Sequence, residues 1–141
     1  MGETGNLMFP WRPDISGGDI CVHDEGGPVV LLDHVSIEWL ILEEGGAPPD
    51  VLTDLHYNKL KDNFDAALAI MEHEKPEQVA AWGFVTHITE YAVGNQAEAP
   101  PDPASLAALD RFLAYVDRKR AKGRVVYATA SEIGDLIFDS P

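Results

Sequence analysis

The feature that most constrains the fold is a near-continuous apolar run at residues 79–87, VAAWGFVTH. A run of this kind, ending at the loop that follows His87, is typical of a strand covered on both faces. Strands buried in this way occur in parallel sheets, where helices cover the two faces. The run therefore predicts βα units in this part of the chain.

Helical periodicity lies on both sides of this run. From Asp50 to about Glu74 the apolar spacing predicts a helix with one buried face, formed by Leu60, Phe64, Ala67, Leu68 and Met71. A long loop, 88–102, separates the run from a second predicted helix. Asp102 as N-cap and Pro103 at the first helical position mark its start. Its apolar stripe comprises Leu106, Leu109, Phe112, Leu113 and Val116.

The last part of the chain predicts one more strand and one more helix. Gly123 stands where a helix-ending glycine belongs, and Val125–Ala128 follows as a short strand. Thr129 and Glu132 have the spacing of a capping box. The closing helix that they begin has a buried face made by Ile133, Leu136 and Ile137.

Glycine and proline dominate the beginning of the chain, so residues 1–27 are expected to form an irregular, loop-rich segment with a short strand at Asp19–His23. Pro28–Leu42 is expected to contain a buried strand. Alternating strands and helices then predict an α/β fold over residues 28–141, a partial (β/α) barrel with mostly parallel strands. The three strands and three helices are too few to close an eight-stranded barrel, which takes about 250 residues.

The chain is acidic: it contains 24 acidic and ten basic residues, which give a net charge of −14. Its basic cluster, residues 118–124, falls at a predicted helix C-terminus, where cations offset the helix dipole. We therefore expect no nucleic-acid partner. No apolar run reaches the roughly 18–20 residues of a membrane span. Cys21 is the single cysteine, so an intrachain disulfide and a Cys-x-x-Cys metal site are both excluded.

His87 is the strongest candidate for chemistry. It ends the most apolar predicted strand and opens the longest loop, and parallel α/β enzymes place catalytic groups at that end of a strand. An imidazole can act there as a general acid or base. The alternative is a histidine that is hydrogen-bonded at a strand end for structural reasons. The five histidines show no spacing that predicts a self-contained zinc site.

The residues around His87 resemble a known family. The segment WGFVTH at 82–87, a variable loop, and then LDRFLAYVDRKRAKGRVVYATASEI resemble the C-terminal end of the polysaccharide deacetylase (NodB-homology) family. PWRPD and GGPVVLLDHVSIEWL, nearer the N-terminus, resemble the stretch between that family's arginine motif and its last strands. The resemblance covers residues 9–138.

The resemblance implies a metal-dependent hydrolase that removes acetyl groups from carbohydrate. His87 then matches the general acid that protonates the leaving group, and Arg12 matches the arginine motif. Trp11 and Tyr91 are expected near the substrate groove. The family's divalent metal, such as zinc, and its catalytic base are held by an Asp-Asp pair and a His-x-x-x-His segment. This sequence contains neither, so no metal ligand and no cofactor is assigned within it.

The chain is therefore expected to be the C-terminal segment of such an enzyme, inactive alone, with a complementing N-terminal half or a second copy of itself as partner. The sequence does not decide whether the chain is an enzyme. The alternative is a non-enzymatic α/β module that binds carbohydrate or a protein partner. The sequence leaves the substrate, the choice between N- and O-deacetylation and the compartment undetermined.

Overall fold

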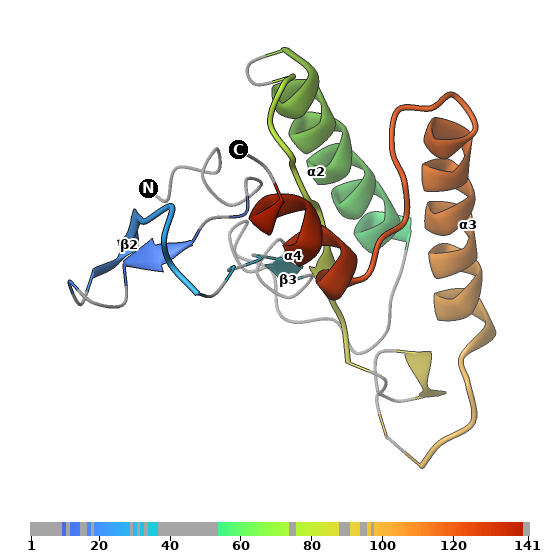
Figure 1. Ribbon diagram of the computed structural model, residues 1–141. Coiled ribbons are helices and arrows are strands. Elements are labelled where there is room, and N and C mark those ends of the chain that lie inside the picture. The colour runs from blue at the N-terminus through green and yellow to red at the C-terminus, as the bar shows by residue number, and fades with distance from the viewer. Residues whose placement is uncertain are drawn as a thin grey trace. The chain divides into compact units, whose positions relative to one another are not determined.

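The computed structural model describes residues 10, 12–14, 17, 19–28, 30, 32, 34–36, 54–73, 76–87, 91–93, 96 and 98–139 (Figure 1). Helices make up most of the regular structure in this part of the chain. α2 spans Asp54–His73, α3 spans Pro103–Arg120 and α4 spans Ala130–Phe138. The predicted helix from Asp50 to Glu74 is thus found with slightly narrower bounds.

Local capping explains where α3 and α4 begin. The Asp102 carboxylate accepts hydrogen bonds from the amide and the hydroxyl of Ser105, at 2.8 Å each, and Pro103 occupies the first turn of α3. Thr129 and Glu132 form the predicted capping box at the start of α4. Gly123, with a φ of 70°, turns the chain after α3.

The strands that the structure describes are short and occur in two separate pairs. β1 (Pro13–Asp14) pairs antiparallel with β2 (Asp19–His23), which has the bounds that the sequence predicts. β3 (Val35–Ser36) pairs in parallel with β4 (Phe84–Val85), in the register Val35↔Phe84 and Ser36↔Val85.

The predicted fold class, a partial (β/α) barrel of mostly parallel strands, was wrong. Three helices of 20, 18 and 9 residues dominate the described part of the chain, and the parallel pairing described there consists of the two-residue strands β3 and β4. Residues 79–83 and 125–128, both expected in strands, adopt neither helix nor strand. An apolar, extended run becomes a strand only where a neighbouring strand completes its hydrogen bonds, and periodicity does not reveal that neighbour.

The chain divides into two compact units, which we describe separately. The first comprises residues 1–34, 67–83 and 127–141, and the second comprises 35–66 and 84–126. Each unit therefore draws on segments that are distant in sequence.

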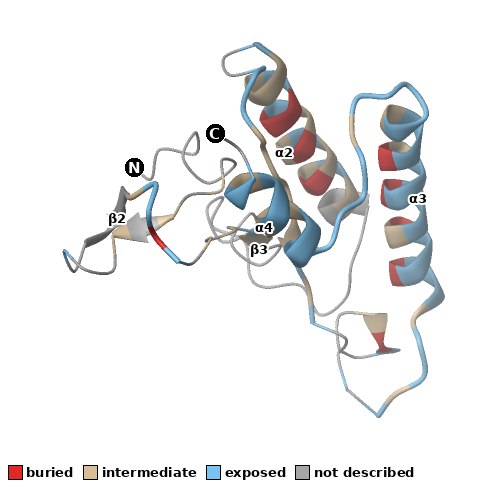
Figure 2. Ribbon diagram, viewed as in Figure 1, coloured by how far each residue is buried: buried red, intermediate tan, exposed pale blue. Residues whose placement is uncertain are grey.

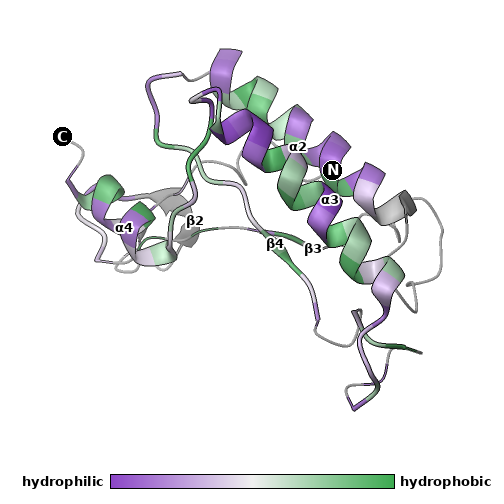
Figure 3. Ribbon diagram, turned by 90° about the vertical axis from the view of Figure 1, so that its right-hand side faces the viewer, coloured by the Kyte–Doolittle hydropathy of each residue, from purple (hydrophilic) through white to green (hydrophobic). Residues whose placement is uncertain are grey.

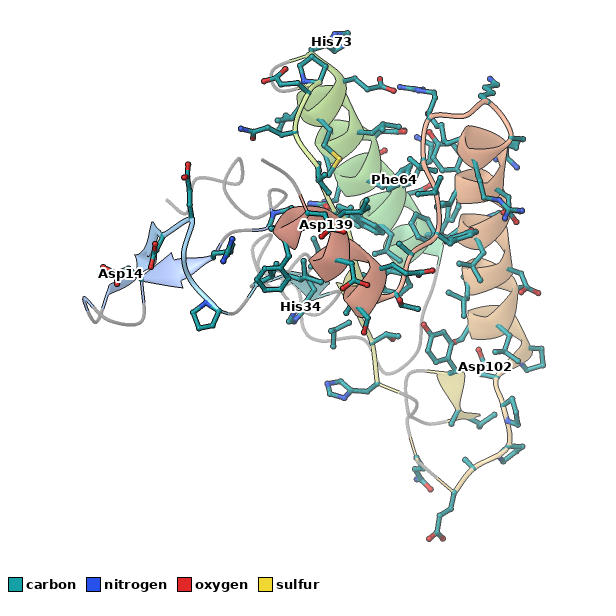
Figure 4. All side chains as sticks on the ribbon, viewed as in Figure 1. Asp14, His34, Phe64, His73, Asp102 and Asp139 are labelled. Atoms are coloured by element: carbon teal, nitrogen blue, oxygen red, sulfur yellow. The ribbon has the colours of Figure 1, made fainter. Side chains whose placement is uncertain are left out.

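An aromatic core holds the second unit together. The Phe112 ring lies edge-on to Phe64, with centroids 6.2 Å apart, and edge-on to Phe84, at 5.7 Å. These contacts join α3 to the first part of α2 and to β4. The helices lie side by side in Figures 1 and 3, and Figure 4 labels Phe64 between them. The buried residues on α3 are Ser105, Ala108, Phe112 and Val116; Leu106 and Leu113, expected in the buried stripe, are exposed.

Candidate functional site

His87, expected as the last residue of a strand, lies two residues after the end of β4, and its side chain is exposed. β4 is held on one side by its parallel pairing with β3 and on one face by the contact between Phe84 and Phe112. The strand, the loop that follows and α3 therefore form one local β-loop-α arrangement. This arrangement presents the imidazole to solvent at the C-terminal end of a parallel strand.

Within the loop after His87, residues 91–93 contact residues 100–102 in the same unit. The Asp102 amide donates to the Tyr91 carbonyl at 2.7 Å, and the Val93 amide donates to the Pro100 carbonyl at 3.0 Å. Ala92 also forms an isolated antiparallel bridge with Pro101. Tyr91, predicted to contact substrate, is half-buried here and belongs to the same unit as His87.

Arg12, the other predicted catalytic residue, belongs to the first unit. Its Nε donates a 2.5 Å hydrogen bond to the Gly27 carbonyl, and its guanidinium carbon lies 4.8 Å from the ring centroid of Phe138. Its own carbonyl accepts from the Asp24 amide at 2.8 Å. These contacts tie the turn after β2 and the end of α4 to the segment around Arg12. Trp11, predicted to line the substrate groove, lies outside the described residues.

Sequence reasoning missed a charged cluster between α2 and α3, formed by Asp65, Tyr115, Lys61 and Lys119. The Tyr115 hydroxyl donates to both carboxylate oxygens of Asp65, with 2.6 Å to Oδ2. Lys61 Nζ lies 3.0 Å from Oδ2 and Lys119 Nζ lies 3.1 Å from Oδ1. The single sequence signal was the i, i+4 spacing of Lys61 and Asp65, because Tyr115 is 50 residues away from Asp65.

The cluster favours the charged forms of Asp65, Lys61 and Lys119. Partial burial by itself raises the pKa of the Asp65 carboxyl, but hydrogen bonds from Tyr115, Lys61 and Lys119 outweigh it and lower that pKa from 3.8 to about 2. The same contacts raise the pKa of Lys61, chiefly through Asp65, and that of Lys119, through Tyr115 and Asp65. Lysines held as ammonium ions are poor nucleophiles and bases, so the cluster is a structural link between the helices.

The metal that the resemblance implies finds no fitting donor set in the described part of the chain. Within those ranges, no group of three or more His, Cys, Asp or Glu side chains is placed to hold an ion. The carboxylate of Asp65, whose pKa is lowered, already binds a tyrosine hydroxyl and two lysine ammonium groups. We therefore derive no chemical step through a metal.

Comparisons with known proteins give no match: none was found among family models, curated proteins or solved structures. The resemblance to polysaccharide deacetylases consequently stays a prediction. Among the helices that the structure describes, none is both long and apolar enough to cross a membrane.

Proposed function

We propose that this chain supplies a general acid, His87, for the hydrolysis of acetyl groups on carbohydrate, and that it acts only together with metal-binding residues that its described part does not contain. The observation that carries the proposal is the exposed imidazole two residues after β4, a strand that is anchored by β3 and by Phe112 of α3. A loop in which residues 91–93 contact residues 100–102 separates this strand from α3. The local arrangement supports the role although the barrel expected around it is not found.

The proposed step for His87 is the transfer of one proton to the leaving group. When an acetyl group is cleaved from an amine or an alcohol, the bond between the carbonyl carbon and the departing nitrogen or oxygen breaks. The departing atom then needs a proton, and a positioned imidazolium can donate it. Because His87 is exposed, it can reach an atom on a polymeric substrate without a deep pocket. Tyr91, in the same unit, offers an aromatic surface of the kind that packs against sugar rings.

The proposal can be tested by NMR with two exposed histidines, because His34 is a matched control for His87. Acetylated chitin oligomers should shift the imidazole signals of His87 and leave those of His34 unchanged. His87→Gln should weaken binding about tenfold, the effect of one lost hydrogen bond to a charged group. His34→Gln should bind like the wild type. A binding curve that is the same for all three proteins would remove His87 from the site.

Activity measurements separate the two parts of the proposal. The chain alone, with added zinc or cobalt, should release no acetate from chitin oligomers or acetylated xylan. Robust release by the chain itself contradicts the need for outside metal ligands. Release that persists unchanged in His87→Gln contradicts the general-acid role.

A second candidate, a non-enzymatic module that binds a protein partner, is favoured by exposed apolar side chains near the C-terminus. Tyr127 and Leu136 are each 54% exposed and Phe138 is 44% exposed, and all three belong to the first unit. Large apolar residues that gather on a surface often mark a binding site. Under this alternative, His87→Gln leaves partner binding unchanged, whereas Leu136→Lys weakens it.

A further inference from the structure

The segment that leads into α3 has the composition of a polyproline II helix. Residues 99–103 read Ala-Pro-Pro-Asp-Pro. The proline ring fixes φ at about −65°, and a residue that precedes a proline is pushed towards the extended region. Ala99, Pro100 and Asp102 each precede a proline, so the sequence favours polyproline II geometry up to the start of α3.

The structure holds this segment extended and leaves its prolines at the surface. Backbone contacts with residues 91–93 fix residues 100–102, and Asp102 has a φ of −83° and a ψ of 115°. Pro100, Pro101 and Pro103 are nevertheless exposed, and Figure 2 draws the stretch before α3 mostly as exposed. The segment is therefore an ordered ridge of exposed prolines that is held in place through its backbone.

Pro100 and Pro103 have the spacing of a ligand for an aromatic groove. A polyproline II helix has three residues per turn, so residues three apart lie on the same side of it. Grooves lined by aromatic side chains bind Pro-x-x-Pro segments of this kind. Leu106, which is 40% exposed, follows Pro103 by three residues on α3 and extends the apolar surface.

Initiation of α3 explains only part of this sequence. Asp102 caps the helix and Pro103 fits its first turn. Neither role requires Pro100 or Pro101, which lie before the cap and form no part of α3. Exposed prolines that are already extended in the free protein lose little conformational freedom on binding, and this pre-organisation favours a complex.

We infer that residues 99–103 dock in an aromatic-lined groove of a partner protein, and that the rim of this groove is basic. Glu98 and Asp102 place carboxylates beside the prolines, and no lysine or arginine lies between Lys75 and Arg111 in the sequence. Lysine and arginine side chains on the rim would complement both this segment and the net charge of −14 of the whole chain.

NMR titration of the whole, isotope-labelled chain with a panel of SH3 and WW domains that have basic rims tests this inference. At least one domain should bind with a dissociation constant below about 100 µM and shift the amide signals of Ala99 and Asp102. Pro100→Ala removes one ring but keeps the carbonyl that accepts from Val93, and should raise this constant at least about tenfold. Pro101→Ala, between the two spaced prolines, is the matched control and should change it less than about threefold.

Three outcomes overturn the inference. They are no binding tighter than about 1 mM by any domain of the panel, binding that Pro100→Ala leaves unchanged, or an equal loss caused by Pro101→Ala. The charge of the rim has its own readout, because Glu98→Lys should weaken binding about threefold at low salt, and an unchanged constant contradicts a basic rim. Circular dichroism confirms that each variant retains its helices. The inference does not depend on the proposed role of His87, so His87→Gln should bind the same domains as the wild type.

Discussion

Two helical regions of this protein form for different reasons. In the second unit, α3 buries Phe112 to 1% exposure against rings from α2 and β4, and a charged cluster links α2 and α3. α4 has a complete capping box and an alternation of apolar and acidic residues, yet none of its nine residues, all of them described, is buried. A helix can therefore be stabilised by its capping residues, by the packing of one face, or by both.

This difference has an energetic side. Short helices are marginal in water, and most helical stability in proteins comes from a packed face. The unit that contains α3 should therefore resist unfolding. The stability of α4 should come mainly from its capping box, because none of its residues is buried. Substitutions in the two regions should separate these contributions.

The largest effect is expected from Phe112→Ala. The substitution removes the edge-on contacts with Phe64 and Phe84 and leaves a cavity, so the free energy of unfolding should fall by about 3–5 kcal/mol. Urea denaturation followed by circular dichroism measures the loss. Leu113→Ala, at the neighbouring exposed position, should cost no more than about 0.5 kcal/mol. Equal losses would show that the aromatic contacts do not organise this unit.

A smaller, pH-dependent effect is expected from Asp65→Asn. The folded-state pKa of Asp65 lies near 2, below the ordinary 3.8, so its ionised form stabilises the folded protein above about pH 4. This contribution is lost as the pH falls from about 4 to about 2. Because one third of the side chain is exposed, solvent screening reduces the expected loss at pH 7 to roughly 1–2 kcal/mol.

Asp62→Asn is the matched control for this effect. Asp62 lies 3.6 Å from Lys61, but 75% of its side chain is exposed. Its substitution should change stability little at any pH. A difference between wild type and Asp65→Asn that stays constant from pH 7 to pH 2 would contradict the assigned cause.

Thr129→Ala tests the helix that is specified by its ends. The substitution removes the hydroxyl that accepts from the Glu132 amide at 3.2 Å, at a cost of about 1 kcal/mol. Amide hydrogen exchange should accelerate in α4 and stay unchanged at the core of α3. If the amides of α3 also exchange faster in Thr129→Ala, and to the same extent, the two regions unfold together. That result would contradict the distinction between them.

The smallest effect on stability is expected from Val126→Lys. The side chain is exposed, so the free energy of unfolding of a dilute, monomeric sample should change by no more than about 0.5 kcal/mol. Thermal denaturation at low concentration measures it. A large destabilisation would mean that Val126 packs within its own chain, which would contradict its exposure.

Local signals in the sequence predicted local structure well. The Asp102 N-cap, the Thr129 capping box and the Asp19–His23 strand are all confirmed, because each depends on neighbours a few residues away. The α2 face was also predicted well, since Leu60, Phe64, Ala67 and Leu68 are buried. Of the predicted site residues, His87 is placed after a strand as expected.

The failures share one cause, which is contact between distant segments. The apolar runs at 79–87 and 125–128 predicted strands, but periodicity does not show whether a partner strand is adjacent. Leu106 and Leu113 were expected in the core because they are apolar, yet α3 buries Ser105 and Ala108. Small residues allow close approach of a helix to its neighbour, and composition does not predict which face will be approached. The contact between Asp65 and Tyr115 could not be predicted either, because 50 residues separate them in the sequence.

The backbone pairing within the loop before α3 has a practical consequence. Three backbone links, Asp102 to Tyr91, Val93 to Pro100 and the bridge between Ala92 and Pro101, hold residues 91–93 against residues 100–102. Glu98, within the loop, is exposed in a turn. Because loop-closure entropy grows slowly with loop length, extra residues inserted there cost little stability. An epitope or a fluorescent label at Glu98 should therefore report on the protein without disturbing the start of α3, at which Asp102 is labelled in Figure 4.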